Sequence, residues 1–196
     1  MYEYLSGKLT SLTPATAVID CGGVGYLTEI TLNTYSAIQE KQEVRLWIHE
    51  VIREDAYLLY GFYTEAEREM FRLLIGVNGV GAATARMMLS SLSVKELGDA
   101  IASQDAKMVQ RVKGVGAKTA QRIVLELQDK VGDTAMGAGL PQASTAMAGA
   151  ASVKKEEAVS ALVMLGFPKT AAEKVVMALD NSMTVEEMIK EGLRRI

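Results

Sequence analysis

The sequence NGVGAATA at residues 78–85 returns 35 residues later as KGVGAKTA at residues 113–120. The apolar positions that follow each copy repeat as well, because Leu89 corresponds to Val124 and Leu92 corresponds to Leu127. Repetition at a fixed offset indicates two copies of one small structural unit. An apolar helical segment precedes each copy, so the unit consists of a helix, a Gly-Val-Gly turn and a second helix. This order is typical of a helix-hairpin-helix element.

The turn of such an element is suited to holding a phosphate group. Its two glycines allow a tight turn and the close approach of another surface. The helix that follows begins with unpaired N–H groups and a partial positive charge, which together favour an anion. The predicted DNA contacts are Asn78, Gly79, Val80, Gly81, Gly114, Val115, Gly116, Lys118, Thr119 and Arg122. Because they would contact phosphates, binding should be insensitive to base sequence.

Other glycine motifs fit these turns poorly. A P-loop would require glycines where Val112 and Ala117 stand, and a dinucleotide-binding fold would require a third glycine where Thr84 and Thr119 stand. Two interpretations remain open: the turns bind phosphate, or they only pack helices together in a protein-interaction scaffold.

The distribution of charge favours the first interpretation. The chain has 196 residues and a net charge of −3, which by itself argues against nucleic acid. Residues 64–132, which contain both copies, are nevertheless net basic at +2, whereas residues 1–63 carry −4, residues 133–151 carry −1 and residues 152–196 are neutral. Nucleic acid, if bound, is therefore expected at residues 64–132.

Four segments follow from the apolar periodicity, and they predict an α+β protein. Residues 1–63 contain five or six short strands and are predicted to form a small OB-like β-barrel. Residues 64–132 are helical and contain the tandem helix-hairpin-helix elements. Residues 133–151 are small and nearly uncharged, as in a flexible linker, and residues 152–196 are predicted to form a three-helix module.

Several functions are not expected from the sequence. Cys21 and His49 are the only cysteine and histidine, so neither a disulfide nor a metal site is predicted. There are no clustered carboxylates and no P-loop, so no catalytic residue and no cofactor are predicted. No leader and no long apolar run occurs, so secretion and membrane spanning are not expected.

Two further stretches, VIDCGGVGY at residues 18–26 and VIREDAYLLYGF at residues 51–62, join the paired turns in a recognisable pattern. With them the chain resembles the RuvA family along essentially its whole length. The resemblance implies a non-catalytic, cytoplasmic bacterial subunit that binds Holliday junctions independently of base sequence during DNA recombination, DNA repair and the SOS response. It implies a homotetramer, with a paired octamer left open, that holds four-way junction DNA open. It also implies two partners: the hexameric RuvB ATPase, which supplies ATP hydrolysis and docks on a UBA-like C-terminal domain, and the RuvC endonuclease.

The resemblance also assigns roles to residues outside the repeat. Glu54 and Asp55 would form an acidic pin at the tetramer centre, although composition alone describes them as the tip of a solvated turn. Ala83 and Ala117 stand where relatives often carry lysine, which leaves affinity and salt dependence open. The partner-binding face is predicted at Leu162, Leu165, Phe167 and Val176, with the module's own core as the alternative. The rival function is a non-catalytic helix-hairpin-helix subunit of another DNA repair nuclease or helicase.

Overall fold

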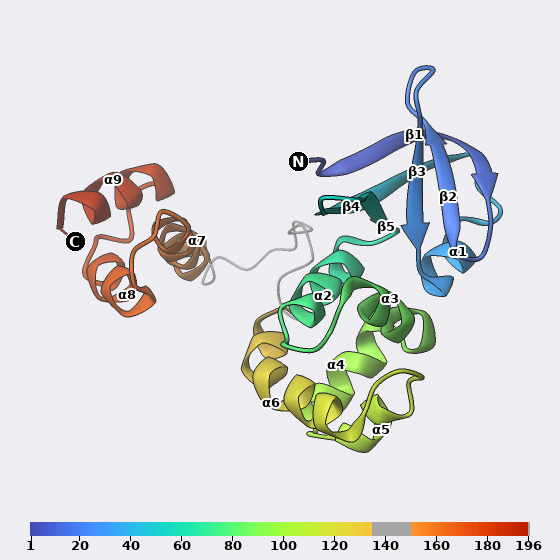
Figure 1. Cartoon of the computed structure of the whole chain (residues 1–196). Coiled ribbons are helices and arrows are strands. Elements are labelled where there is room, and N and C mark those ends of the chain that lie inside the picture. Colours follow the sequence, from blue (N-terminus) through green and yellow to red (C-terminus); the bar gives the residue numbers. More distant parts are fainter. Residues whose placement is uncertain (135–149, 196) are drawn as a thin grey trace. The chain divides into compact units, whose positions relative to one another are not determined.

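A computed structural model of the chain describes residues 1–134 and 150–195 (Figure 1). The chain forms two compact units, Met1–Leu140 and Pro141–Ile196. Most of the predicted linker at residues 133–151 lies outside the described residues. Its first two residues belong to the helix that ends at Thr134, and its last two belong to the helix that begins at Ala150.

The first unit begins with a closed five-stranded barrel. Its strands are β1 (Tyr4–Leu12), β2 (Thr16–Asp20), β3 (Gly25–Ile30), β4 (Glu43–Ile52) and β5 (Tyr57–Phe62), in the order β1-β2-β3-β5-β4. All pairs are antiparallel except β3 with β5. Alternate residues of β4, such as Leu46 and Ile48, point into the barrel and are fully buried. The predicted barrel is confirmed, and a short helix α1 (Leu32–Ile38) between β3 and β4 was not predicted.

Five helices follow the barrel within the same unit: α2 (Glu65–Ile75), α3 (Ala82–Ser91), α4 (Val94–Ala102), α5 (Ala106–Gln110) and α6 (Ala117–Thr134). The Thr64 hydroxyl accepts a hydrogen bond from the Glu67 amide at 3.2 Å and so caps α2. The apolar core of these helices continues into the barrel, because the Phe62 ring of β5 packs on Phe71 of α2 with ring centroids 4.8 Å apart.

A buried polar seam also joins α2 to the barrel. The Arg68 guanidinium is 2% exposed and lies 4.9 Å from the centre of the Trp47 ring. It forms ion pairs with Glu3 of the chain's N-terminal segment at 2.7 Å, with Glu65 at 3.2 Å and with Glu69 at 3.1 Å. Because one buried cation holds carboxylates from both parts, the seam fixes the helices against the barrel.

A second buried ionisable residue of α2, Glu67, also contacts the barrel domain. The Glu67 side chain accepts hydrogen bonds from the hydroxyls of Thr31 and Thr34, at the start of α1. Burial raises the pKa of Glu67, and these two hydrogen bonds oppose that effect. Nearby, the Asn33 amide donates to the carbonyls of Leu89 and Leu92 at the end of α3. The barrel therefore contacts the first helix-hairpin-helix element at both of its helices.

The second unit contains α7 (Ala150–Met164), α8 (Lys169–Met177) and α9 (Val185–Arg195). Gly166, two residues after the end of α7, has a φ of +99°, the left-handed conformation that commonly terminates a helix. The core of the unit is formed by Ala158, Val159, Leu162, Ala172, Val176, Leu179 and Met188. Within the described parts of the chain, no helix is both long enough and apolar enough to cross a bilayer.

Candidate nucleic-acid interface

The two repeated turns have the same backbone geometry. Gly79 has a φ of +92° and Gly114 a φ of +90°, a region that residues with a side chain rarely adopt. In the first turn the Val80 amide donates to the Val77 carbonyl at 3.0 Å, and in the second the Val115 amide donates to Val112 at 3.1 Å. The sequence repeat is therefore a repeat in conformation.

The second glycine of each turn, Gly81 or Gly116, is not explained by backbone conformation. Gly81 has an ordinary φ of −87°, and Gly116 is likewise outside the positive-φ region. A Cβ atom built on either residue would meet no atom within 4 Å. Neither the backbone conformation nor packing within the described chain requires glycine here. The open space instead suits the close approach of an external backbone.

Free amide groups line this open space. Gly81 caps α3 without a side-chain hydrogen bond, and the first backbone bond of the helix runs from Ala85 to Gly81 at 2.9 Å. The second copy is identical, with Ala120 donating to Gly116 at 2.9 Å. Among the described residues no acceptor occupies the earlier amides of either helix. Each helix start therefore presents donors and positive dipole to an anion.

The predicted contacts divide into exposed residues and buried anchors. Asn78, Gly79, Gly81, Gly114, Gly116, Lys118 and Arg122 are exposed, and Thr119 is half-buried. Val80 and Val115 are each only 5% exposed, so their side chains anchor the turns in the core. Contact of Val80 and Val115 with DNA therefore stays a prediction, and it would have to involve the backbone rather than the buried side chains.

The cations around the two turns have different surroundings. Lys118 is exposed, and no described residue pairs with it. Arg86 of the first element instead forms an ion pair with Glu29 of the barrel and donates to the Ala15 carbonyl at 3.1 Å. Arg86 therefore belongs to the contact between the helices and the barrel.

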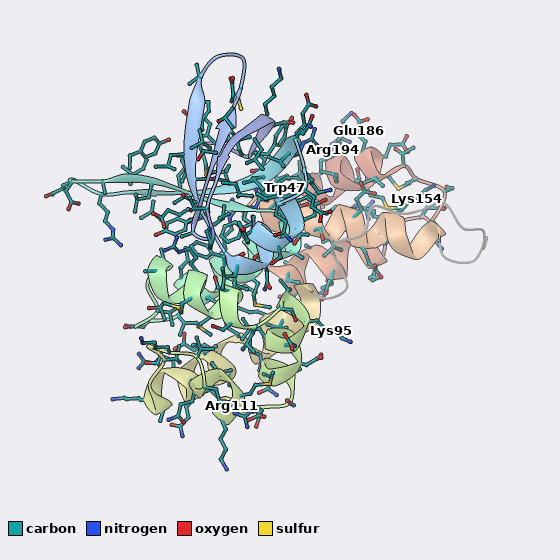
Figure 2. The ribbon with its side chains drawn as sticks, turned by 90° about the vertical axis from the view of Figure 1, so that its right-hand side faces the viewer. Trp47, Lys95, Arg111, Lys154, Glu186 and Arg194 are labelled. Carbon is teal, nitrogen blue, oxygen red and sulfur yellow. The ribbon has the colours of Figure 1, made fainter. Side chains whose placement is uncertain are left out.

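Two exposed cations were missed by the sequence analysis. Lys113 lies in the second turn, at the position that Asn78 occupies in the first, and Arg111 directly follows α5. Figure 2 shows Arg111 at the end of the helices that is farthest from the barrel. Their position inside and beside the repeated turn was the signal that could have identified them.

Glu54 and Asp55 lie at the tip of the β4–β5 hairpin, which extends away from the barrel in Figure 2. The Arg53 amide donates to the Ala56 carbonyl at 2.8 Å and closes the turn. Both acidic side chains are exposed, and neither has a partner among the described residues. The hairpin therefore presents two free carboxylates to solvent.

The predicted partner-binding residues lie mostly inside the second unit. Leu162 and Val176 are fully buried in its core, and Phe167 is partly buried against it. Leu165 alone is well exposed, at 60%, beside Met164 at 90%. Leu162 and Val176 therefore match the alternative role of core residues, and a partner-binding role for Leu165 and Phe167 stays a prediction.

The remaining candidate groups form no site. Within residues 1–134 and 150–195 no three His, Cys, Asp or Glu side chains lie close enough to hold a metal ion. His49 packs on Phe71 with ring centroids 5.3 Å apart, and burial together with Arg72 and Arg68 lowers the pKa of His49. Cys21 is partly buried, and its thiol donates to the Ser6 carbonyl.

Comparison with known proteins matches each part of the chain. Residues 1–61 match the family described as RuvA N terminal domain, residues 71–129 match SAM-like Helix-hairpin-helix tandem, and residues 154–196 match RuvA, C-terminal domain. Similar relatives occur in Bacteroides thetaiotaomicron at 50% identity, Bacteroides fragilis at 48% and Porphyromonas gingivalis at 45%. Each comparison covers 100% of both chains, and each relative is named Holliday junction branch migration complex subunit RuvA.

Proposed function

Because this chain belongs to the RuvA family, we propose that it binds Holliday junctions as the DNA-binding subunit of a branch migration complex. The observation that carries the proposal is the pair of congruent turns with free helix-start amides. They lie in the only net-basic segment of the chain. Nothing favours the rival, a helix-hairpin-helix subunit of another repair nuclease or helicase.

In the proposed mechanism each turn holds one phosphate backbone. Free amides of α3 and α6 donate to phosphate oxygens, and Gly81 and Gly116 leave room for the strand to approach. Lys118 adds a cation to the second site. None of these groups reads a base edge, so the protein recognises the shape of the DNA rather than its sequence.

The four arms of a junction suggest a cyclic homotetramer, because each arm then meets one identical site. In this arrangement residues 1–63 form the tetramer, residues 64–132 bind DNA, and residues 133–151 link them to a motor-binding module at residues 152–196. The module would recruit the RuvB ATPase through the exposed Met164 and Leu165, leaving ATP hydrolysis to RuvB. RuvC would act on the same junction, and the complex would work in the bacterial cytoplasm.

The first prediction is a preference for junctions. A gel shift at moderate salt, where non-specific binding is suppressed, should show tighter binding to a four-way junction than to a linear duplex of equal length. Exchanging the base sequence of the arms should change neither affinity. Equal affinity for both DNAs contradicts the junction proposal, and no binding to either favours the protein-interaction scaffold. Native mass of the complex tests the tetramer in the same sample.

The second prediction concerns the β4–β5 turn. Replacing Glu54 by Gln and Asp55 by Asn should tighten binding to linear duplex at least tenfold, and binding to the junction less. Each carboxylate near phosphate costs on the order of 1 kcal/mol at high effective dielectric, and a tetramer would present both acids four times. Continuous duplex would cross the centre of the tetramer, whereas an open junction leaves a gap there.

The matched control neutralises two other exposed barrel acids, Glu40 and Glu43. Glu43 begins β4 and Ile52 ends it, so the control charges lie at the opposite end of that strand. The control variant should bind both DNAs as the parent does. If the variant at Glu54 and Asp55 also binds both DNAs as the parent does, these two acids are only exposed residues of a solvated turn.

A further inference from the structure

The two phosphate-binding elements are connected by one side chain. Arg122 belongs to α6, in the second element, and its Nη1 donates to the carbonyl oxygen of Asn78 at 3.3 Å. Asn78 directly precedes Gly79 in the first turn. Among the described residues this is the one hydrogen bond between α6 and that turn. A residue of the second element therefore holds the turn of the first.

The first element makes no equivalent hydrogen bond to the turn of the second element among the described residues. Within the repeat the counterpart of Arg122 is Met87 of α3, which is 47% exposed and has no hydrogen-bond donor in its side chain. The counterpart of Asn78 is Lys113. The duplicated geometry is thus asymmetric at this position, and only the first turn receives such a contact.

The environment of Arg122 favours a positioning role. Its Nε lies 3.5 Å from the Glu126 carboxylate, one helical turn further along α6. The guanidinium therefore bridges an acid of its own helix and a carbonyl of the other element. Glu126 orients the group and offsets part of its charge, whereas Lys118 on the same helix has no such partner among the described residues.

We propose that Arg122 is a positioning residue that fixes the first turn relative to the second, so that both sets of free amides meet the DNA together. This inference rests on the proposed junction binding. A turn held in place before binding loses less freedom when DNA arrives, which increases affinity without adding a DNA contact. Arg122 thereby supports the element that has Ala83 where the other has Lys118.

The salt dependence of binding separates this role from a direct phosphate contact. Removing a phosphate contact lowers the slope of log affinity against log salt by about 0.9. Removing a positioning residue weakens binding at every salt concentration and leaves the slope unchanged. Lysine can supply a cation but cannot reproduce the planar fork that reaches both Glu126 and Asn78.

The third prediction uses Arg122→Gln, Arg122→Lys and the matched variant Lys118→Gln. Junction affinity is measured over a range of KCl concentrations. Arg122→Gln and Arg122→Lys should each weaken binding about tenfold with an unchanged slope. Because a tetramer would lose four such contacts, Lys118→Gln should reduce the magnitude of the slope by about 3.6.

Amide hydrogen exchange of the free protein provides a readout that needs no DNA. Exchange at Val80 should accelerate several-fold in both Arg122 variants, while Val115, whose equivalent hydrogen bond lies in the other turn, stays as in the parent. A lower slope with unchanged exchange, or full rescue by lysine, would overturn the inference. Failure of the parent itself to bind junctions would instead remove the proposed function, and the exchange comparison would still test the contact.

Discussion

Replacing Gly81 and Gly116 together by aspartate is expected to abolish junction binding while leaving the free protein as stable as before or slightly more stable. Both glycines have ordinary backbone conformations and open space at the Cβ position, so a side chain fits the free protein. Aspartate is a good N-cap and stabilises a helix by up to a few tenths of a kcal/mol relative to glycine.

The same carboxylates would occupy the space proposed for phosphate. Each would take up helix-start amides whose hydrogen bonds to a charged group contribute about 1.5–3 kcal/mol. Each would also repel DNA by on the order of 1 kcal/mol. Over two sites the expected loss of affinity exceeds about 1,000-fold, since every 1.4 kcal/mol is tenfold. A gel shift with the junction measures the loss, and thermal unfolding measures the stability.

The matched control replaces both glycines by serine, which also caps a helix but carries no charge. Its affinity should lie between those of the parent and the aspartate variant. If the aspartate variant binds junctions normally, the helix starts do not face phosphate. If it unfolds more easily, the glycines are required by the fold itself.

Replacing Arg68 by alanine is expected to destabilise the first unit by about 2–5 kcal/mol, the cost of truncating a large buried side chain, because Arg68 is 2% exposed whereas its three acidic partners are partly exposed. The change removes the contact with Trp47 and leaves Glu3, Glu65 and Glu69 close together without their cation. Trp47 is the only tryptophan of the chain. The fluorescence of Trp47, monitored during unfolding in urea, therefore reports directly on the seam.

Arg45→Ala is the matched control, because Arg45 also lies over an aromatic ring, that of Tyr4 at 4.5 Å, but is exposed. Removing the Arg45 side chain should lower the free energy of unfolding by less than about 1 kcal/mol, because exposed charged contacts usually contribute no more than that. An Arg68 variant as stable as this control would show that the buried Arg68 side chain contributes little to holding the helices on the barrel.

The features that sequence predicted well are local ones. The paired turns depend on glycines at a fixed spacing, and the strands depend on alternation over a few residues, so both are visible in short windows. The seam depends on contacts between distant residues. Arg68 lies among Glu65 and Glu69 and therefore resembles an exposed helical charge, while its partner Glu3 is 65 residues away in the sequence.

Periodicity also failed to separate apolar residues that pack inside from those on the surface. Val80 and Val115 lie in turns whose glycines are exposed, yet both valines are core anchors. Leu162 and Leu165 are close in sequence at the end of α7, but only Leu165 is exposed. Which residue faces outward depends on how the neighbouring helices pack, which no short window contains.

The neutral state of His49 has a consequence for how the protein responds to acidity. His49 is the only side chain of the chain whose ordinary pKa lies near neutrality, and its pKa is lowered in the folded protein. Because the folded form takes up this proton less readily than the unfolded form, His49 reduces stability only as the solution becomes more acidic than about pH 6.5. Well above that value His49 is neutral in both the folded and the unfolded form, so folding exchanges no proton with the buffer through this residue. Near neutral pH, therefore, His49 does not make the stability of the protein depend on acidity, whereas the salt concentration would still change DNA binding through the phosphate contacts.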